Sequence, residues 1–214
     1  MSTMKNKKWN SSDIPDMTGK VVIVTGANSG IGYETTLALA KKNARVIMAC
    51  RSSKRAGDAR EGIVKQVPNA QVDIATLNLA SMESIRTFSA DFLSHHSQLD
   101  ILINNAAVAF LPRKKTEDGF ETHFGVNHLG HFALTGLLLP ALLDTPESRI
   151  VTVVTIGHIA ARLNFDDLQG ECSYSSFDAY VRSELANVLF AFELQRKLES
   201  ARFNSSSIAV HPGM

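Results

Sequence analysis

Cysteine is scarce in this chain of 214 residues. The two cysteines, Cys50 and Cys172, are too few for a disulfide framework and have no partners at metal-ligand spacing. None of the seven histidines has a carboxylate or cysteine companion at that spacing either. A chain of this size buries about 70% of the surface that its unfolded form exposes, so one core suffices without such cross-links. We therefore expect a single domain, no metal site and a reducing, cytoplasmic location.

An excess of charge of either sign is also absent. Lysine and arginine number 22 against 21 aspartates and glutamates, and 44% of the residues are hydrophobic. Nucleic-acid-binding domains carry a basic excess, and disordered chains are more polar than this one. The composition indicates a folded protein with no nucleic-acid partner.

Long hydrophobic runs are missing as well. Residues 1–16 form a polar extension that contains lysines and lacks the apolar core of a signal peptide. The longest apolar run, from Phe132 to Leu143, contains Pro140 and is far shorter than the roughly 20 residues that cross a bilayer. We expect no transmembrane segment, while peripheral attachment to a membrane stays open.

The chain does contain a regular alternation of Val- and Ile-rich runs with longer segments of helical periodicity. This alternation is typical of strand–helix–strand units around a parallel sheet that is buried on both faces. Strands are expected over residues 21–25, 45–50, 71–75, 99–103, 149–154 and 207–211. Helices are expected over residues 30–42, 54–66, 82–94, 125–143 and 177–199, and loops over 111–116 and 164–176. With no repeat or linker, the pattern predicts one doubly wound α/β domain over residues 1–214, with six strands.

A glycine-rich turn follows the first expected strand. It reads T-G-A-N-S-G-I-G from Thr25 to Gly32 and runs directly into a helical pattern. Glycines let the backbone approach a pyrophosphate, whose charge is favoured by free N–H groups at the start of the helix. The alternative is a tight turn that only packs the helix against the strand. The candidate binding residues of this turn are Gly26, Asn28, Ser29, Gly30, Ile31 and Gly32.

The motifs, taken in order, resemble the short-chain dehydrogenase/reductase superfamily. The family's motifs find counterparts in T-G-x-x-x-G-x-G, in the N-N-A-A segment Asn104-Asn105-Ala106-Ala107, and in Asn127, Tyr180 and Pro212-Gly213. The segments Asp118-Gly119-Phe120-Glu121 and Leu185-Ala186-Asn187-Val188-Leu189-Phe190 look most like the retinol dehydrogenase and WW-domain oxidoreductase branch. The resemblance extends from about Ile14 to the last residue. It implies an NAD(P)-binding Rossmann fold and interconversion of a small-molecule alcohol and carbonyl, of hydrophobic character.

The resemblance also implies roles for single residues. Tyr180 would exchange a proton with the substrate oxygen while the nicotinamide exchanges a hydride with its carbon, and Asn127 would support a water relay. Further cofactor contacts are implied for Asn78, Asn104, Ala106, Pro212 and Gly213.

The end of the second expected strand indicates which dinucleotide is preferred. Family members that prefer NAD usually carry an acid there, but this chain has Cys50. Arg51 follows at once, with Lys54 and Arg55 nearby, and these cations could pair with the extra phosphate of NADP. The alternative is that they belong to the solvated first turn of a helix. We predict a preference for NADP(H), with NAD(H) second.

Two catalytic positions depart from the family pattern. Thr155 stands at the serine position and keeps a hydroxyl, although its extra methyl group crowds the site. Glu184 stands at the lysine position, one helical turn after Tyr180. Two unit charges about 5 Å apart interact by roughly 3 kcal/mol at an effective dielectric near 20, so the reversed charge raises the tyrosine pKa. Arg182 cannot replace the lysine, because position i+2 faces the other side of the helix.

After Pro212-Gly213 only Met214 remains, whereas relatives of this kind continue through a substrate-covering segment and a seventh strand. We therefore expect an open substrate pocket and an exposed edge on the sixth strand, with self-association through helices or through that strand.

Three hypotheses about the function follow. The first is an impaired NADP(H)-dependent oxidoreductase. The second is an inactive family member that serves as a dinucleotide-binding or protein-interaction module, and the third is an unstable remnant without function.

Overall fold

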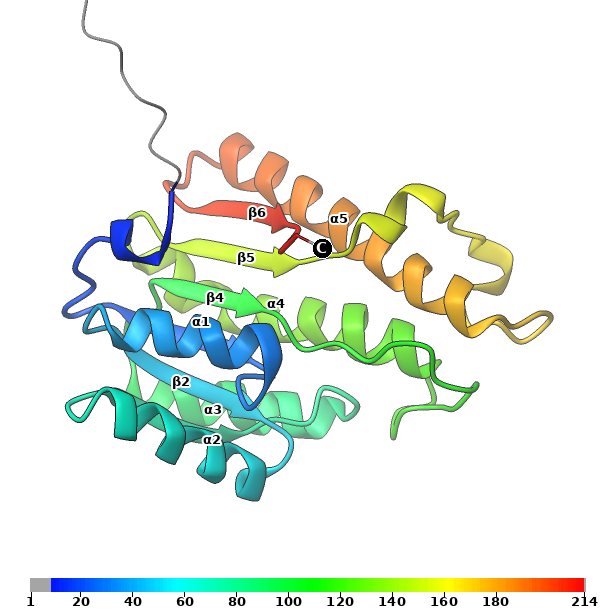
Figure 1. Ribbon diagram of the computed structural model, residues 1–214. Helices are drawn as coiled ribbons and strands as arrows, with labels where there is room; N and C mark the ends of the chain where they lie inside the picture. Colours follow the sequence, from blue (N-terminus) through cyan, green and yellow to red (C-terminus); the bar gives the residue numbers. More distant parts are fainter. Residues whose placement is uncertain (1–8, 214) are drawn as a thin grey trace, which may run out of the picture.

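A six-stranded, fully parallel sheet with the order β3-β2-β1-β4-β5-β6 organises the molecule (Figure 1). The computed structural model describes residues 9–213. The strands are β1 (Val21–Thr25), β2 (Arg45–Cys50), β3 (Gln71–Thr76), β4 (Ile101–Asn104), β5 (Arg149–Val153) and β6 (Ser206–Val210). The predicted doubly wound α/β class with six strands is thereby confirmed.

The helices lie in two layers, one on each face of the sheet. They are α1 (Gly30–Ala40), α2 (Ser53–Gln66), α3 (Met82–His95), α4 (Gly130–Asp144) and α5 (Ser176–Ser200). Short helical turns are η1 (Ser11–Asp13), η2 (Phe124–Leu129), η3 (Ile156–Ala160) and η4 (Phe165–Asp167). Helices α1 and α2 pack on one face of the β1–β3 half, and α3, α4 and α5 pack on the opposite face.

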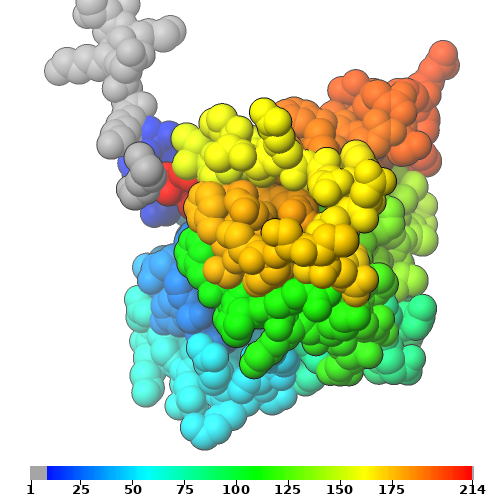
Figure 2. All heavy atoms as spheres, turned by 90° about the vertical axis from the view of Figure 1, so that its right-hand side faces the viewer, coloured from blue at the N-terminus to red at the C-terminus, as the bar shows by residue number. Residues whose placement is uncertain are grey.

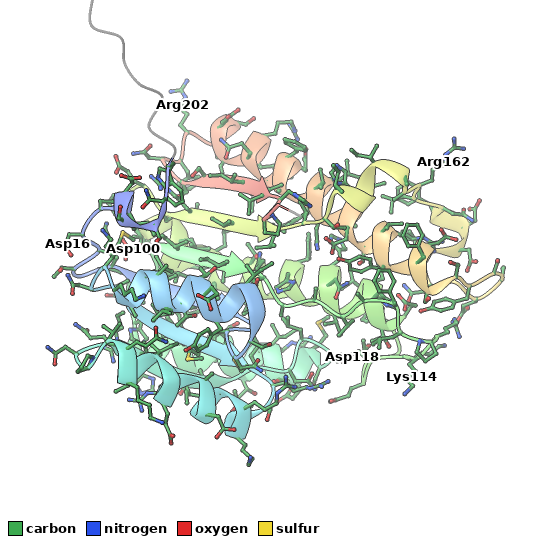
Figure 3. The ribbon with its side chains drawn as sticks, viewed as in Figure 1. Asp16, Asp100, Lys114, Asp118, Arg162 and Arg202 are labelled. Carbon is green, nitrogen blue, oxygen red and sulfur yellow. The ribbon has the colours of Figure 1, made fainter. Side chains whose placement is uncertain are left out.

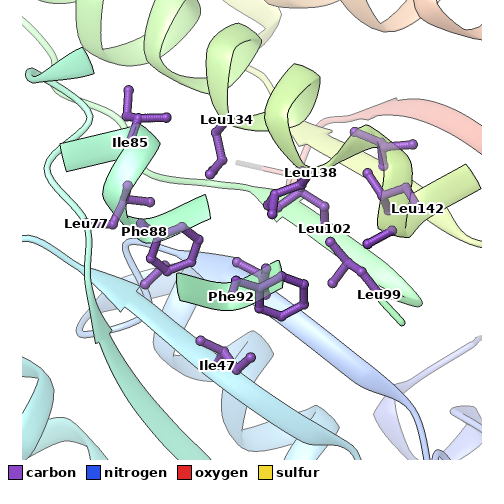
Figure 4. Close-up of a cluster of buried hydrophobic side chains, with 14 of the residues drawn as sticks. Ile47, Leu77, Ile85, Phe88, Phe92, Leu99, Leu102, Leu134, Leu138 and Leu142 are labelled. Atoms are coloured by element: carbon purple, nitrogen blue, oxygen red, sulfur yellow. The ribbon is translucent and has the colours of Figure 1, made fainter. Parts of the chain in front are cut away.

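The strands consist of continuous apolar runs because helices cover both faces of the sheet. Val22, Ile23 and Val24 are completely buried, with alternate side chains belonging to the two separate cores. Figure 4 shows one core, in which Leu134 and Leu138 of α4 meet Leu102 of β4. Because parallel strands all end at the same edge of the sheet, the loops after β1, β4 and β5 come together there.

Helix boundaries differ from the expected ones by a few residues, for local reasons. Helix α1 ends at Ala40, before the expected Lys42, because Asn43 takes a left-handed conformation with φ 68 that turns the chain into β2. Strand β4 begins at Ile101, since the N–H of Leu99 donates instead to the Thr145 hydroxyl at 3.0 Å.

The helical stretch that contains the longest apolar run is longer than the sequence suggested. It runs without a break from Phe124 to Asp144, because Pro140 is accommodated within α4, and its 21 residues meet the length and hydropathy of a membrane span. Its buried residues Leu134, Leu138 and Leu142 form part of the sheet core (Figure 4). The stretch is therefore a core helix of this α/β domain.

β6 is one of the two outer strands of the described sheet. One backbone N–H group of β6 is bound by a side chain, because the N–H of Ser207 donates to the Gln195 side-chain oxygen at 2.7 Å. Such side-chain capping reduces the tendency of an edge strand to pair with another chain.

Candidate active site

The turn between β1 and α1 brings backbone segments unusually close together. A Cβ atom added at Gly32 would lie 2.4 Å from the Gly26 carbonyl oxygen, and one at Gly26 would lie 3.0 Å from Ala106. Gly26 and Gly30 also have left-handed φ values of 66 and 54. These positions require glycine, and the turn leaves the N-terminus of α1 open to an anion.

A buried hydrogen-bond knot ties the end of β4 to the end of β1. The Thr25 hydroxyl accepts from the N–H groups of Asn105 and Ala106, each at 2.9 Å. The Asn105 side chain donates to the Thr25 carbonyl at 2.8 Å. This knot holds the N-N-A-A segment against the glycine-rich turn. Sequence reasoning missed Thr25 and Asn105 as functional residues, although both adjoin predicted ones.

His131 of α4 completes the knot. Its Nδ1 lies 2.8 Å from the carbonyl oxygen of Asn127, which can only accept, so Nδ1 carries the proton. Its Nε2 must then accept from the Thr25 hydroxyl at 2.9 Å. Burial lowers the pKa of His131 to about 4, in agreement with a neutral ring. The histidine is a structural hydrogen-bonding residue.

A cleft of about 410 Å³ lies beside this turn at the carboxyl ends of the strands. Of the predicted cofactor residues, those that line it are Gly26, Asn28, Arg51, Asn78 and Ala106. Arg55 lines it as well, whereas Lys54 points to solvent and lies 3.8 Å from Asp58. The structure thus separates the predicted basic cluster into two arginines at the cleft and one lysine outside it.

The other predicted cofactor residues do not line the cleft. Asn104 is 1% exposed and donates to the Thr135 hydroxyl at 3.1 Å. Ser29, Gly30, Ile31 and Gly32 form the start of α1, and Pro212 and Gly213 follow β6 as exposed residues. The Asn78 side chain, which does line the cleft, donates to Glu117 at 2.7 Å and accepts from the N–H of Ala80 at 3.1 Å.

Tyr180, Thr155 and Asn127 come from three elements that meet at the carboxyl edge of the sheet. Tyr180 lies near the start of α5, Thr155 follows β5, and Asn127 lies in η2. The pKa of Tyr180 is raised by burial and by the negative charge of Glu184, while a hydrogen bond with the Thr155 side chain lowers it.

Asn127 is held rigidly. Its side chain exchanges two 2.9 Å hydrogen bonds with the backbone of Val108, one to the carbonyl and one from the N–H. It also donates to the Ser183 hydroxyl at 3.0 Å, and Ser183 is completely buried between η2 and α5. These contacts bring the loop after β4 and the helix of Tyr180 to one place.

Glu184 is 3% exposed and points to the end of β5. Its Oε2 atom accepts from the backbone N–H of Thr155 at 2.7 Å. Burial raises the pKa of Glu184 to about 7, so the carboxyl group is partly protonated near neutral pH. Its repulsion of a tyrosinate is therefore weaker than that of a full charge, although the direction agrees with the sequence-based expectation. Arg182 faces away from Tyr180, as expected, and donates to the carbonyl of Asp167 at 2.8 Å.

Cys50, the last residue of β2, carries a free thiol. Cys50 is buried, and burial raises the pKa of its thiol. Across residues 9–213 no group of three or more His, Cys, Asp or Glu side chains could hold a metal ion.

Comparison with known sequences finds a matching family model and similar proteins. A family model described as short chain dehydrogenase matches residues 20–166. Retinol dehydrogenase 12 of Mus musculus is 47% identical over 196 residues, which make up 92% of this chain and 61% of that protein. The chain thus spans about three fifths of the length of this relative.

Solved structures share the fold. An uncharacterized protein from Mycobacterium Paratuberculosis has a TM-score of 0.87 at 40% identity, covering 97% of this chain and 73% of that one. The Pseudomonas aeruginosa RhlG/NADP active-site complex has a TM-score of 0.74 at 20% identity, covering 92% of this chain and 73% of that one.

Proposed function

Because the chain belongs to the short-chain dehydrogenase family, we propose that it is an NADP(H)-dependent oxidoreductase with weakened proton transfer. The observation that carries the proposal is the proximity of Tyr180 and Thr155 at the carboxyl edge of the sheet, the same edge that holds the glycine-rich turn. The names of the relatives suggest a hydrophobic alcohol/carbonyl pair of the retinol and retinaldehyde type.

The residues present fit a dinucleotide. The close approach of Gly26, Gly32 and Ala106 leaves no space for side chains, and the first turn of α1 has no side-chain cap on its N–H groups, which is the cradle that a pyrophosphate needs. Arg51 and Arg55 line the same cleft, and neutral Cys50 stands where an acid would repel a phosphate. This combination supports NADP(H) over NAD(H). When bound, the nicotinamide would supply or accept the hydride.

The chain's own residues would handle the proton. Tyr180 would donate it to the carbonyl oxygen or accept it from the alcohol, and the Thr155 hydroxyl would orient that oxygen. Asn127 would hold the loop after β4 against α5 beside them. Glu184 opposes ionisation of Tyr180, so we propose turnover that is slow at neutral pH.

A second candidate function is favoured by the same glutamate. Glu184 is buried against Thr155, and no lysine stands one turn after Tyr180 to lower its pKa. The chain would then bind the dinucleotide without turning over a substrate. Such a protein would act as a binding or interaction module of cytoplasmic location.

One paired experiment tests both candidates. NADPH and NADH are titrated separately by their fluorescence, and retinaldehyde reduction is then assayed for the parent and for Glu184→Lys. Measurable turnover in the parent that rises in the variant supports the impaired enzyme. Binding with no turnover in the parent supports the binding module, and absence of NADPH binding contradicts both.

A further inference from the structure

Phe110, in the loop after β4, has an unusual backbone conformation. Its φ of 57 lies in the left-handed region, which a bulky residue rarely adopts because its side chain crowds the backbone. The ring is also 59% exposed, so burial in the core does not compensate for the strain. A strained residue persists only where neighbouring contacts impose its conformation, and such residues gather at functional sites.

The contacts that impose this conformation act on the next residue, Leu111. The N–H of Leu111 donates to Nε2 of His123 at 3.1 Å, and its carbonyl oxygen accepts from the Tyr174 hydroxyl at 3.0 Å. Both backbone groups of Leu111 are thus held by side chains from other parts of the chain. We call His123, Tyr174 and the Glu121 carboxylate that holds His123 the Leu111 clamp.

Glu121 makes the Leu111 clamp rigid. Glu121 and His123 are 2% and 0% exposed. Because Nε2 of His123 accepts from Leu111, its Nδ1 carries the proton and donates to Glu121 Oε1 at 2.9 Å. The Glu121 carboxylate also accepts from the N–H groups of His123 and Phe124 at 3.0 and 2.8 Å. These bonds hold the pKa of Glu121 below its usual value.

The clamp places Phe110 beside the candidate catalytic tyrosine. The Phe110 ring meets the Tyr180 ring edge-on with centroids 5.1 Å apart, and it lies parallel to the Phe177 ring at 6.3 Å. Figure 2 shows the yellow and orange part of the chain lying directly on the green part. Phe177 is 50% exposed, so the pair presents flat apolar surface to the solvent next to Tyr180.

We propose that Phe110 and Phe177 are specificity-determining residues that form a stacking wall for the apolar part of the substrate. Glu121, His123 and Tyr174 are positioning residues that hold this wall in place. The wall selects carbonyl compounds whose apolar part is flat, aromatic or conjugated, because offset stacking needs a planar partner. The proposal rests on the proposed function in one respect: Tyr180 is taken as the group that meets the carbonyl oxygen.

Replacing Phe110 by glycine separates this role from a structural one. Glycine removes the ring and also relieves the left-handed backbone, so Phe110→Gly should not lower the thermal midpoint. The matched control is Glu147→Gly, since Glu147 has the same left-handed backbone, with φ 58, in the exposed turn before β5 at the opposite edge of the sheet.

The ligands are cinnamaldehyde, which is flat, and 3-cyclohexylpropanal, its saturated counterpart, titrated by ligand-detected NMR with and without NADPH. We expect the parent and Glu147→Gly to prefer cinnamaldehyde by about 2- to 12-fold, and Phe110→Gly to lose that preference. If the parent binds cinnamaldehyde and 3-cyclohexylpropanal equally well, or if Phe110→Gly keeps the preference for cinnamaldehyde, the proposed stacking wall is wrong. The titration without NADPH gives this answer even if NADPH fails to bind, and that failure would contradict the proposed function alone.

Tyr174→Phe tests the Leu111 clamp. It removes the donor to the Leu111 carbonyl and should reduce the preference for cinnamaldehyde. In the double variant with Phe110→Gly it should cause no further change, because the ring that it positions is gone. If Tyr174→Phe lowers only the thermal midpoint and leaves the preference intact, the residue is merely structural and the clamp assignment is wrong.

Discussion

The Glu184 carboxylate accepts a 2.7 Å hydrogen bond from the backbone N–H of Thr155. Through this bond α5 holds the end of β5, where the Thr155 side chain lowers the pKa of Tyr180. A lysine has three donors and no acceptor, so it could not make this contact. With glutamate at position 184, the site lacks a cation that would favour tyrosinate. It gains instead the hydrogen bond that orders the end of β5. Two consequences can be measured separately, one on turnover and one on stability.

The first prediction concerns the charge at position 184. Turnover of retinaldehyde at pH 7 should increase at least about tenfold in Glu184→Lys, because the cation favours ionisation of Tyr180. Glu184→Gln keeps an oxygen acceptor for Thr155 but removes the charge, so its turnover should lie between those of the parent and the lysine variant. Steady-state rates of the three proteins check this order. A parent at least as fast as Glu184→Lys would contradict the role assigned to the glutamate.

The second prediction concerns pH-dependent stability. Burial raises the pKa of Glu184 from an ordinary 4.5 to about 7, so the folded protein holds this proton more tightly than the unfolded chain. Its stabilising contribution is fully present below about pH 4.5 and is lost as the pH rises through about 7. Between these limits the free energy of unfolding of the parent should fall by about 3 kcal/mol relative to Glu184→Gln.

Urea unfolding of the two proteins at several pH values between 4.5 and 8 measures this difference. Carboxylates with lowered pKa, such as Glu121 and Asp100, titrate alike in both proteins and cancel in the comparison. Parallel curves for the parent and Glu184→Gln would show that the carboxyl group titrates normally.

The sequence predicted those features that are encoded over a few neighbouring residues. Buried parallel strands read as apolar runs, and the turn after β1 reads as glycines, because each depends on local backbone and burial requirements. The Thr25–His131 bond and the Thr155–Glu184 bond join residues 106 and 29 positions apart, so only the tertiary fold brings them together. The sequence also could not show that Arg51 and Arg55 line the cleft while Lys54 lies outside it. That difference depends on how the start of α2 is oriented toward the cleft.

The third prediction tests the choice of dinucleotide. Arg51→Ala should weaken NADPH binding about tenfold or more while leaving NADH binding nearly unchanged, since a charge-assisted hydrogen bond to the extra phosphate is worth about 1.5–3 kcal/mol. Lys54→Ala is the matched control, because Lys54 has the same charge but its side chain lies outside the cleft. Fluorescence titrations of the three proteins with both dinucleotides decide the matter. An equal loss for NADH and NADPH would remove the basis for the NADP(H) preference.

The last prediction concerns the knot that joins β1 to β4 beneath the cleft. Thr25→Val leaves the N–H groups of Asn105 and Ala106 and the Nε2 atom of His131 without their hydroxyl partner. We expect a loss of about 2–4 kcal/mol in the free energy of unfolding, because unsatisfied buried groups retain their full desolvation penalty. The position is far from Asp16 and Asp100, which Figure 3 places at the opposite edge of the sheet.

Thr36→Val is the matched control for this knot. Thr36 is equally buried, but its hydroxyl makes one bond, to the carbonyl of Gly32 within the same helix at 2.8 Å. That carbonyl keeps its place in the helix when the hydroxyl is removed, so Thr36→Val should cost about 1 kcal/mol or less. Urea unfolding compares the two substitutions, and NADPH titration adds a second readout. Thr25→Val should also weaken NADPH binding, because Ala106, which faces the cleft, is held by the lost bond. Equal stability losses in the two variants, with NADPH affinity unchanged in both, would show that the knot does not support the cleft.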